Sequence, residues 1–247
     1  MQKKIEQLQK IIDECSSIVF FGGAGVSTES GIPDFRSVSG LYHQQWKYSP
    51  EVILSHSFFE KQTEEFYRFY REKILFLDAQ PNDAHKALAK LEEKGKLKAV
   101  VTQNIDGLHQ KAGSKSVFEL HGSVLRNFCT KCGAFYNAEY IKKSDTSSEN
   151  IPICSNKDCG GIIKPDVVLY EEGLDNNVVN GAVQSISNAD CLIIGGTSLI
   201  VYPAASLVNY FNGKYLVLIN KTDSLQGANI DLTINAPIGE VFSKLKI

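Results

Sequence analysis

The chain has 247 residues, of which 43% are hydrophobic and 22% are charged, the composition of an ordinary globular protein. This length fits one large domain, or a large domain with a smaller insert. A formal net charge of −2 provides no positive field, so we expect neither a nucleic-acid partner nor an anionic membrane partner. The first 15 residues lack a signal-peptide core, and no apolar run approaches the roughly 18 residues of a membrane span, so we expect a cytoplasmic protein.

The chain opens with a predicted amphipathic helix, because apolar residues recur at helical spacing: Ile5, Leu8, Ile11, Ile12 and Cys15. Short apolar runs then predict five buried strands: Ile18–Phe21, Leu97–Val101, Val117–Leu120, Asp190–Ile194 and Tyr215–Ile219. Between them lie predicted helices: Asp83–Lys94, Asn176–Asn188 and Pro203–Asn212. This alternation predicts an α/β fold with a Rossmann-like, doubly wound parallel sheet, the architecture of nucleotide-binding domains.

Two segments interrupt the alternation. Residues 38–82 are rich in aromatic and charged side chains and have a helical pattern, whereas residues 126–164 carry four cysteines and little helical period. We expect these segments to form a smaller domain from a helical module and a zinc-binding module. The remaining segments, 1–37, 83–125 and 165–247, are then the Rossmann-like, nucleotide-binding domain.

Four of the six cysteines form two close pairs, Cys129 with Cys132 and Cys154 with Cys159. In a reducing cytosol such a cluster favours a metal over disulfides. Four thiolates would complete a tetrahedral zinc shell with no open position, so we predict a structural zinc ion; a redox pair or chance clustering are the alternatives. Cys15 and Cys191 lie alone in apolar surroundings, which predicts buried thiols.

A glycine-rich loop, Gly22–Gly25, follows the first predicted strand, with Ser27 and Thr28 close behind. Glycines let a backbone approach a pyrophosphate, whose oxygens can then bind N–H groups and hydroxyls. The loop is not a regular G-x-G-x-x-G and lacks the lysine of a phosphate loop, so a plain tight turn is the alternative.

Polar groups also follow the other predicted strands: Thr102–Asp106, His121-Gly122, Gly196–Ser198 and Asn220. The carboxyl ends of parallel strands meet at one edge of a sheet, where such sheets bind ligands. Each group alone is compatible with a polar turn. Their repetition at one edge predicts a shared binding site.

At these residues the sequence resembles the sirtuin family. The matching motifs occur in order and span essentially the whole chain: GAGVS (Gly23–Ser27), GIPDFR (Gly31–Arg36), TQNID (Thr102–Asp106), HG (His121-Gly122), GTSL (Gly196–Leu199) and the two cysteine pairs. The resemblance is to a compact, prokaryotic-type catalytic core. It implies an NAD-dependent protein lysine deacetylase, which transfers acetyl from acetyl-lysine to NAD and releases nicotinamide and 2′-O-acetyl-ADP-ribose.

The resemblance also implies roles for individual residues. His121 matches the general base, and an imidazole titrates near neutrality, as that role requires. Asn104 would orient the ribose and a water, Gln103 would face the ribose, and Phe35 would shield the reacting face. Asp106 and the backbone of Ile105 would bind the nicotinamide carboxamide. The remaining implied NAD contacts are Gly23, Ala24, Gly25, Ser27, Thr28, Arg36, Gly196, Thr197, Ser198, Asn220 and Ile238.

The segment Pro165–Glu172 resembles the substrate-binding strand of the family, in which the peptide pairs with protein backbone as an added strand. Val168, Leu169 and Tyr170 would contact an acetyl-lysine peptide or protein, with Val168 on the lysine stem. Glu171 stands where the family commonly has glycine. Its carboxylate would either alter peptide affinity, through basic flanking residues, or lie in a solvated loop.

The acyl group can also be predicted. Family members that remove succinyl or malonyl groups carry a tyrosine and, three residues later, an arginine. Here Tyr67 is followed at that spacing by Tyr70, and around the helix the neighbouring Arg71 and Arg68 lie about 100° and about 160° away from that position. An anionic acyl group would lack its partner, so we expect deacetylation, or removal of longer apolar acyl chains.

Three other functions are compatible with an NAD site. The main alternative is ADP-ribosyl transfer to protein; a non-enzymatic NAD sensor and a dehydrogenase are the others. His121 together with Asn104 favours deacylation, and a dehydrogenase would typically keep a late acidic residue for the adenosine ribose. We expect a monomer.

Overall fold

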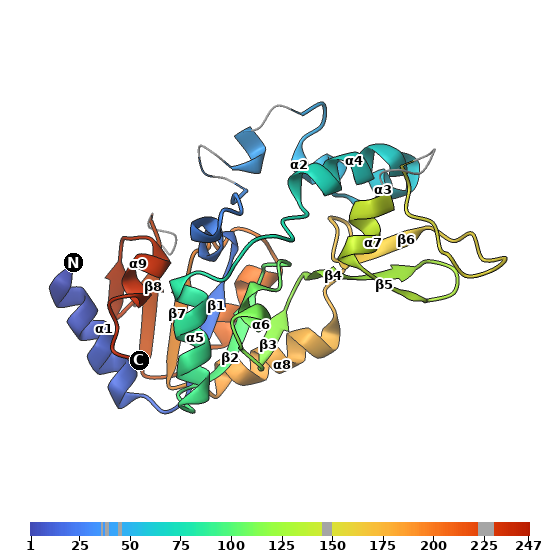
Figure 1. Ribbon diagram of the computed structural model, residues 1–247. Coiled ribbons are helices and arrows are strands. Elements are labelled where there is room, and N and C mark those ends of the chain that lie inside the picture. The colour runs from blue at the N-terminus through green and yellow to red at the C-terminus, as the bar shows by residue number, and fades with distance from the viewer. Residues whose placement is uncertain (36, 38–39, 44–45, 145–149, 222–229) are drawn as a thin grey trace.

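The computed structural model describes residues 1–35, 37, 40–43, 46–144, 150–221 and 230–247. A six-stranded parallel sheet and a three-stranded antiparallel sheet form two separate regions of the molecule (Figure 1). The predicted fold class, a Rossmann-like parallel sheet with a smaller domain, is confirmed.

The large sheet has the strand order β3-β2-β1-β7-β8-β9, and every neighbouring pair is parallel. The chain therefore extends the sheet from β1 in one direction and later from β7 in the other. The carboxyl ends of β1 and β7 flank the topological switch point, where open parallel sheets bind ligands. The strands are β1 (Ile18–Gly22), β2 (Leu97–Thr102), β3 (Val117–Glu119), β7 (Cys191–Gly195), β8 (Tyr215–Ile219) and β9 (Leu232–Ile234).

Helices cover both faces of this sheet because successive strand residues point to opposite faces. Phe20 packs in one hydrophobic cluster with α1 (Gln2–Glu14), α5 (Asp83–Glu93) and α9 (Ile238–Phe242). Its neighbour Phe21 packs in a second cluster with α8 (Asn176–Ser187) and the 3₁₀ helix η5 (Ala204–Tyr210). The large region is thus a three-layer sandwich. Its other short helices are η1 (Ala24–Val26), η2 (Thr28–Ser30) and α6 (Leu108–Lys111).

The five predicted strands are all present, with ends that differ by at most one residue from the prediction. One predicted helix differs in type, because η5 is a 3₁₀ helix. The N–H and hydroxyl groups of Ser206 both donate to Pro203 O (3.0 and 2.7 Å), which closes a tighter turn than an α-helix has. The short strand β9 was not predicted.

The two interrupting segments pack together in one hydrophobic cluster, beside each other in Figure 1. Aromatic rings dominate it; Phe66, for example, stacks on Tyr70 with ring centroids 5.5 Å apart. The elements are η3 (Leu41–His43), α2 (Pro50–Ile53), α3 (His56–Lys61), α4 (Thr63–Lys73), β4 (Gly122–Cys129), β5 (Phe135–Asn137), α7 (Ala138–Lys143) and β6 (Ile163–Val167). The predicted domain limits after residues 125 and 164 fall within β4 and β6, and the division itself stays a prediction.

Candidate functional site

The loops that follow β1 and β7 pack directly against each other. Gly25 N donates a hydrogen bond to Gly196 O (2.7 Å), and a Cβ on Gly25 would lie 2.8 Å from Gly196 Cα. Gly196 has a φ of +59°, and a Cβ there would lie 2.4 Å from Val26 N. Both positions therefore require glycine, and two motifs about 170 residues apart form one backbone cradle at the switch point.

Three polar side chains beside this cradle form a hydrogen-bonded chain. Asn104 Nδ2 donates to Ser27 Oγ (3.0 Å), and Ser27 Oγ donates to Asp106 Oδ2 (2.6 Å). Leu108 N donates to the other carboxylate oxygen of Asp106 (2.9 Å). Burial raises the pKa of Asp106. The chain fixes the amide of Asn104 with its nitrogen toward Ser27, which leaves the amide oxygen for a ligand.

His121 lies between the two sheets, one residue before β4. Its Nδ1 is 2.9 Å from Gln103 O, and a carbonyl oxygen only accepts, so Nδ1 carries the proton. In the neutral ring Nε2 is then an unprotonated acceptor. Burial lowers the pKa of His121, which keeps the imidazole neutral near pH 7. His121 therefore has the protonation state that a general base needs.

A cavity of about 930 Å³ joins the edge of the large sheet to the small region, a size suited to a cofactor and part of a substrate. It brings together most of the predicted NAD-site residues: Ala24, Gly25, Ser27, Thr28, Phe35, Gln103, Asn104, Ile105, Asp106, His121, Gly196, Thr197, Ser198, Asn220 and Ile238. Gly23 does not line it and instead lies under Thr197, while Arg36 lies outside the described residues.

The cavity fits a dinucleotide on two grounds. A side chain at Gly25 or Gly196 would clash with the backbone of the opposite loop, so the two loops approach closely and present bare backbone to the cavity at these positions. Gln103 also lines the cavity, and its buried Nε2 has no hydrogen-bond partner in the part of the chain that the structure describes. A buried donor of this kind fits a ligand rich in hydroxyl and phosphate oxygens.

The predicted substrate-binding segment leaves β6 and runs along the cavity. Val168 N donates to His121 O (3.0 Å), and Tyr170 N donates to Leu54 O (3.0 Å). His56 N in turn donates to Tyr170 O (3.0 Å). The segment is therefore fixed between the residue that matches the base and the helical module. Val168, Leu169 and Tyr170 all line the cavity.

Glu171 lies in an exposed turn and contacts the helical module. Its φ is +76°, a conformation that glycine favours. Its carboxylate accepts hydrogen bonds from Ser57 N (2.9 Å) and Ser57 Oγ (3.0 Å), in the first turn of α3. These bonds lower the pKa of Glu171. The side chain is exposed, as one alternative expected, but it caps a helix, which was not predicted.

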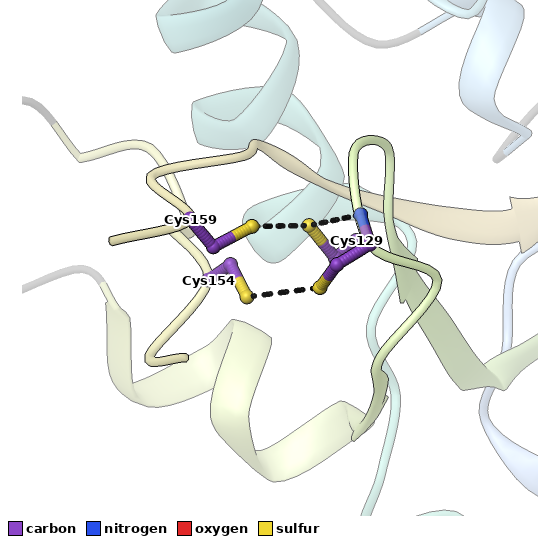
Figure 2. A group of neighbouring side chains, drawn as sticks. Cys129, Cys154 and Cys159 are labelled. Atoms are coloured by element: carbon purple, nitrogen blue, oxygen red, sulfur yellow. Dashed lines mark hydrogen bonds between the residues drawn. The ribbon is translucent and has the colours of Figure 1, made fainter. Parts of the chain in front are cut away.

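The four clustered cysteines meet at the end of the small sheet (Figure 2). All four Sγ atoms lie within 4.8 Å of one another, and the Sγ atoms of Cys129 and Cys159 are 3.6 Å apart, as are those of Cys132 and Cys154. Tetrahedral zinc with Zn–S bonds of about 2.3 Å requires sulfur separations of this order. The N–H of Cys132 lowers the pKa of Cys129, favouring its thiolate. The cluster fits the predicted structural zinc ion.

The wall that the helical module contributes was not predicted residue by residue. Leu54, Tyr70 and Ile74 line the cavity opposite the large sheet. The aromatic pattern of residues 58–70 indicated a helical core, but not which side chains would face a ligand. Tyr70 was singled out only for its spacing from Tyr67.

Known proteins match this chain over nearly its whole length. A family model described as Sir2 family matches residues 23–203. A protein named NAD-dependent protein deacetylase from Clostridium perfringens is 60% identical and covers 99% of both chains. One of the same name from Cutibacterium acnes is 48% identical, over 98% of this chain and 97% of its own.

Solved structures agree. Sir2 with a p53 peptide and NAD⁺ is 40% identical to this chain, with a TM-score of 0.85, and the match covers 97% of this chain and 96% of that one. Sir2 bound to an acetylated peptide is 39% identical, with a TM-score of 0.84 and the same coverage. The chain belongs to the Sir2 family. The predicted sirtuin resemblance and the predicted enzyme class, NAD-dependent protein deacetylase, are thereby confirmed, as is NAD as the cofactor.

Proposed function

We propose that this chain transfers the acetyl group of acetyl-lysine in proteins to NAD, releasing nicotinamide and 2′-O-acetyl-ADP-ribose. The observation that carries the proposal is the position of His121. Its unprotonated Nε2 belongs to the same cavity as the Asn104–Ser27–Asp106 chain and the glycine cradle. This reaction requires a base, a set of fixed polar groups and a phosphate cradle, all at one switch point.

NAD supplies an electrophilic ribose carbon and nicotinamide as the leaving group. Around it, Gly25, Gly196 and the hydroxyls of Thr197 and Ser198 would hold the phosphates. Asn104 and Gln103 would hold the ribose next to the nicotinamide, and Asp106 would hold the carboxamide. The predicted contacts of Gly23 and Arg36 have less support, because the former does not line the cavity and the latter is not described.

His121 would take a proton from a ribose hydroxyl. Because its Nδ1–H donates to Gln103 O, the imidazole can hold the new proton on Nε2 while its orientation stays fixed. Burial of the ring disfavours the charged form, so the proton is passed on readily. ADP-ribosyl transfer to protein needs no base at this position, which is why His121 favours deacylation over that alternative.

The acyl-lysine partner is a peptide or protein chain in extended form. The hydrogen bonds from Val168 N to His121 O and from Tyr170 N to Leu54 O hold the segment 168–170 along the cavity, where the peptide would lie beside it. Val168 would pack on the lysine stem.

The preferred acyl group is uncharged. Arg71, one candidate partner for a carboxylate, donates instead to Ile141 O (2.9 Å) and Ser144 Oγ (2.7 Å). The other, Arg68, pairs with Glu65 (2.7 Å). Lys73 lines the cavity, but its ammonium is 2.9 Å from Glu72 Oε1. A succinyl or malonyl group would therefore lose its hydration without gaining a free cation.

We also propose a cytoplasmic monomer with no nucleic-acid partner. The net charge of −2 supports the last point, because it provides no positive field for nucleic acid. Among the described residues, no helix is long and apolar enough to cross a membrane.

The test is mass spectrometry of an acetyl-lysine peptide incubated with the enzyme and NAD, with a succinyl-lysine peptide of the same sequence beside it. We expect NAD-dependent loss of acetyl, release of nicotinamide, and a rate about 10²–10⁴-fold lower for His121→Ala. A melting curve checks that the variant folds. An unchanged peptide with ADP-ribose on protein would refute deacylation, and faster loss of succinyl than of acetyl would refute only the predicted acyl preference.

A further inference from the structure

Arg126 of β4 forms ion pairs with residues of two other strands. Its Nη1 lies 2.8 Å from Glu119 Oε2 at the end of β3, and its Nε lies 2.7 Å from Asp166 Oδ2 on β6. Strand β3 belongs to the large sheet and β6 to the small one, so one guanidinium joins the two regions of the molecule (Figure 1). The side chain of Glu119 is only 9% exposed, so water and salt screen this pair less than an ordinary surface pair.

The contacts of Arg126 enclose the turn that carries the residue matching the base. His121 lies two residues after Glu119, in the connection that enters β4. The next residue, Gly122, has a φ of +75°, and a Cβ there would clash with Asp166 O. Arg126 therefore holds both the residue that precedes the turn and the residue that packs against it.

The imidazole itself is oriented by one hydrogen bond. The Nδ1–H of His121 donates to Gln103 O (2.9 Å), which leaves Nε2 for a ribose hydroxyl. Burial lowers the pKa of His121, and the bond to Gln103 raises it. Neither of these influences is a neighbouring charge, so the effect of Arg126 is on the position of the ring and not on its basicity.

We propose that Arg126 is a positioning residue for His121, whose two ion pairs hold the turn between the sheets so that Nε2 faces the ribose hydroxyl. This inference rests on the proposed lysine deacylase function. It separates two steps of that reaction. The acyl oxygen of the substrate carries no proton, so nicotinamide can leave and return before a base acts, whereas acyl transfer to the ribose hydroxyl needs the base. Loss of Arg126 should weaken the second step and spare the first.

The experiment measures both steps in wild type, Arg126→Met and Arg126→Lys. Exchange of isotopically labelled nicotinamide into NAD, with the acetyl peptide present, reports the first step, and loss of acetyl reports the whole reaction. In Arg126→Met we expect kcat for deacetylation to fall about tenfold, while nicotinamide exchange and KM for the peptide stay within about twofold. Arg126→Lys should recover part of the lost rate, because its ammonium keeps the charge but lacks the planar fork that reaches both carboxylates.

Arg71→Met is the matched control. Arg71 also donates two hydrogen bonds between elements, to Ile141 O (2.9 Å) and Ser144 Oγ (2.7 Å), but within the small region. Its loss should lower the melting temperature and keep the wild-type ratio of deacetylation to exchange.

A second measurement needs neither NAD nor peptide. In ¹⁵N-labelled free enzyme, the ring signals of His121, assigned with His121→Ala, should show one tautomer with the proton on Nδ1. We expect Arg126→Met to lose this Nδ1–H signal through exchange with water, and Arg71→Met to keep it.

An unchanged ratio of deacetylation to exchange in Arg126→Met, or an equal fall of both rates, overturns the inference while wild-type turnover leaves the deacylase function standing. If Arg126→Met does not fold, Glu119→Gln gives the same test, because it keeps the shape of the side chain and removes the ion pair. Absence of both reactions in the wild type would refute the deacylase function itself.

Discussion

The two sheets of this molecule are stabilised in different ways. The large sheet is covered by helices on both faces, and Ile18, Val19, Phe20 and Phe21 of its β1 strand are fully buried. The small sheet has three strands of eight, three and five residues, and its Phe128 and Phe135 are exposed. So small a sheet buries too little apolar surface to be stable alone. One region is held by burial, and the other by an aromatic cluster together with metal coordination.

Removing one thiolate should have the largest effect, because it removes the metal that stabilises the small region. Cys129→Ala should lose the zinc ion and nearly all deacetylase activity, because binding of a structural zinc is worth about 10–16 kcal/mol. The control is Cys191→Ala, which removes a buried thiol from the core of the large sheet and should keep both zinc and activity. Elemental analysis by plasma mass spectrometry and the peptide assay check both variants. A Cys129→Ala protein with full zinc and activity would contradict a metal-dependent small region.

Two buried histidines should make the stability of the large region sensitive to acid. His85 and His109 are almost fully buried, with ring centroids 4.7 Å apart. Burial lowers the pKa of His85 to about 4 and that of His109 to about 3, against about 6.5 in an unfolded chain. Folding therefore disfavours the charged rings. Their contribution to stability is complete above pH 6.5 and is lost as the pH falls from there toward 4.

Urea unfolding at pH 7.5 and pH 5 measures this loss. Each histidine should cost about 2 kcal/mol of unfolding free energy at pH 5. In the variant His85→Gln, the glutamine can still accept the N–H bond that Asn82 donates to His85 Nδ1 in the capping box of α5. Combined with His109→Leu, it should flatten the pH dependence. If the double variant loses as much unfolding free energy between pH 7.5 and pH 5 as the wild type, other groups cause the acid sensitivity.

The smallest expected change in stability concerns the contact between the substrate segment and the helical module. Glu171→Ala should lower stability by about 1 kcal/mol, because Ser57 N and Ser57 Oγ in the first turn of α3 lose their acceptor while the positive φ remains. Glu171→Gly loses the same two hydrogen bonds but relieves the backbone strain, so its stability should stay near that of the wild type. Urea unfolding of the two variants compares them directly. Equal losses would mean that the strained backbone carries no cost here.

The sequence predicted the large region well because its signals are local. Each buried strand is an uninterrupted apolar run, and the glycine and cysteine motifs are short and ordered. The contact between Gly25 and Gly196 joins residues 171 positions apart, so no local pattern could show it. The same holds for Glu171 with Ser57, where the partner that explains the carboxylate lies on another module.

The small region was harder to predict for a different reason. Strand β5 has only three residues, too few to show a pattern, and β6 alternates over only five residues, with Pro165, a residue that argues against a strand, at its centre. The two partners of Arg126 are equally invisible in a sequence, since they lie on β3 and β6 and only the fold brings them together.

His121 lies in the two-residue connection between β3, in the large sheet, and β4, in the small one. The residue that matches the base therefore lies at the junction of the two sheets. Arg126 bridges Glu119 (2.8 Å) and Asp166 (2.7 Å) across the same junction and braces it. The Nδ1–H bond to Gln103 O ties the ring to the loop that carries Asn104, so the alignment of the base depends on how firmly this junction is held.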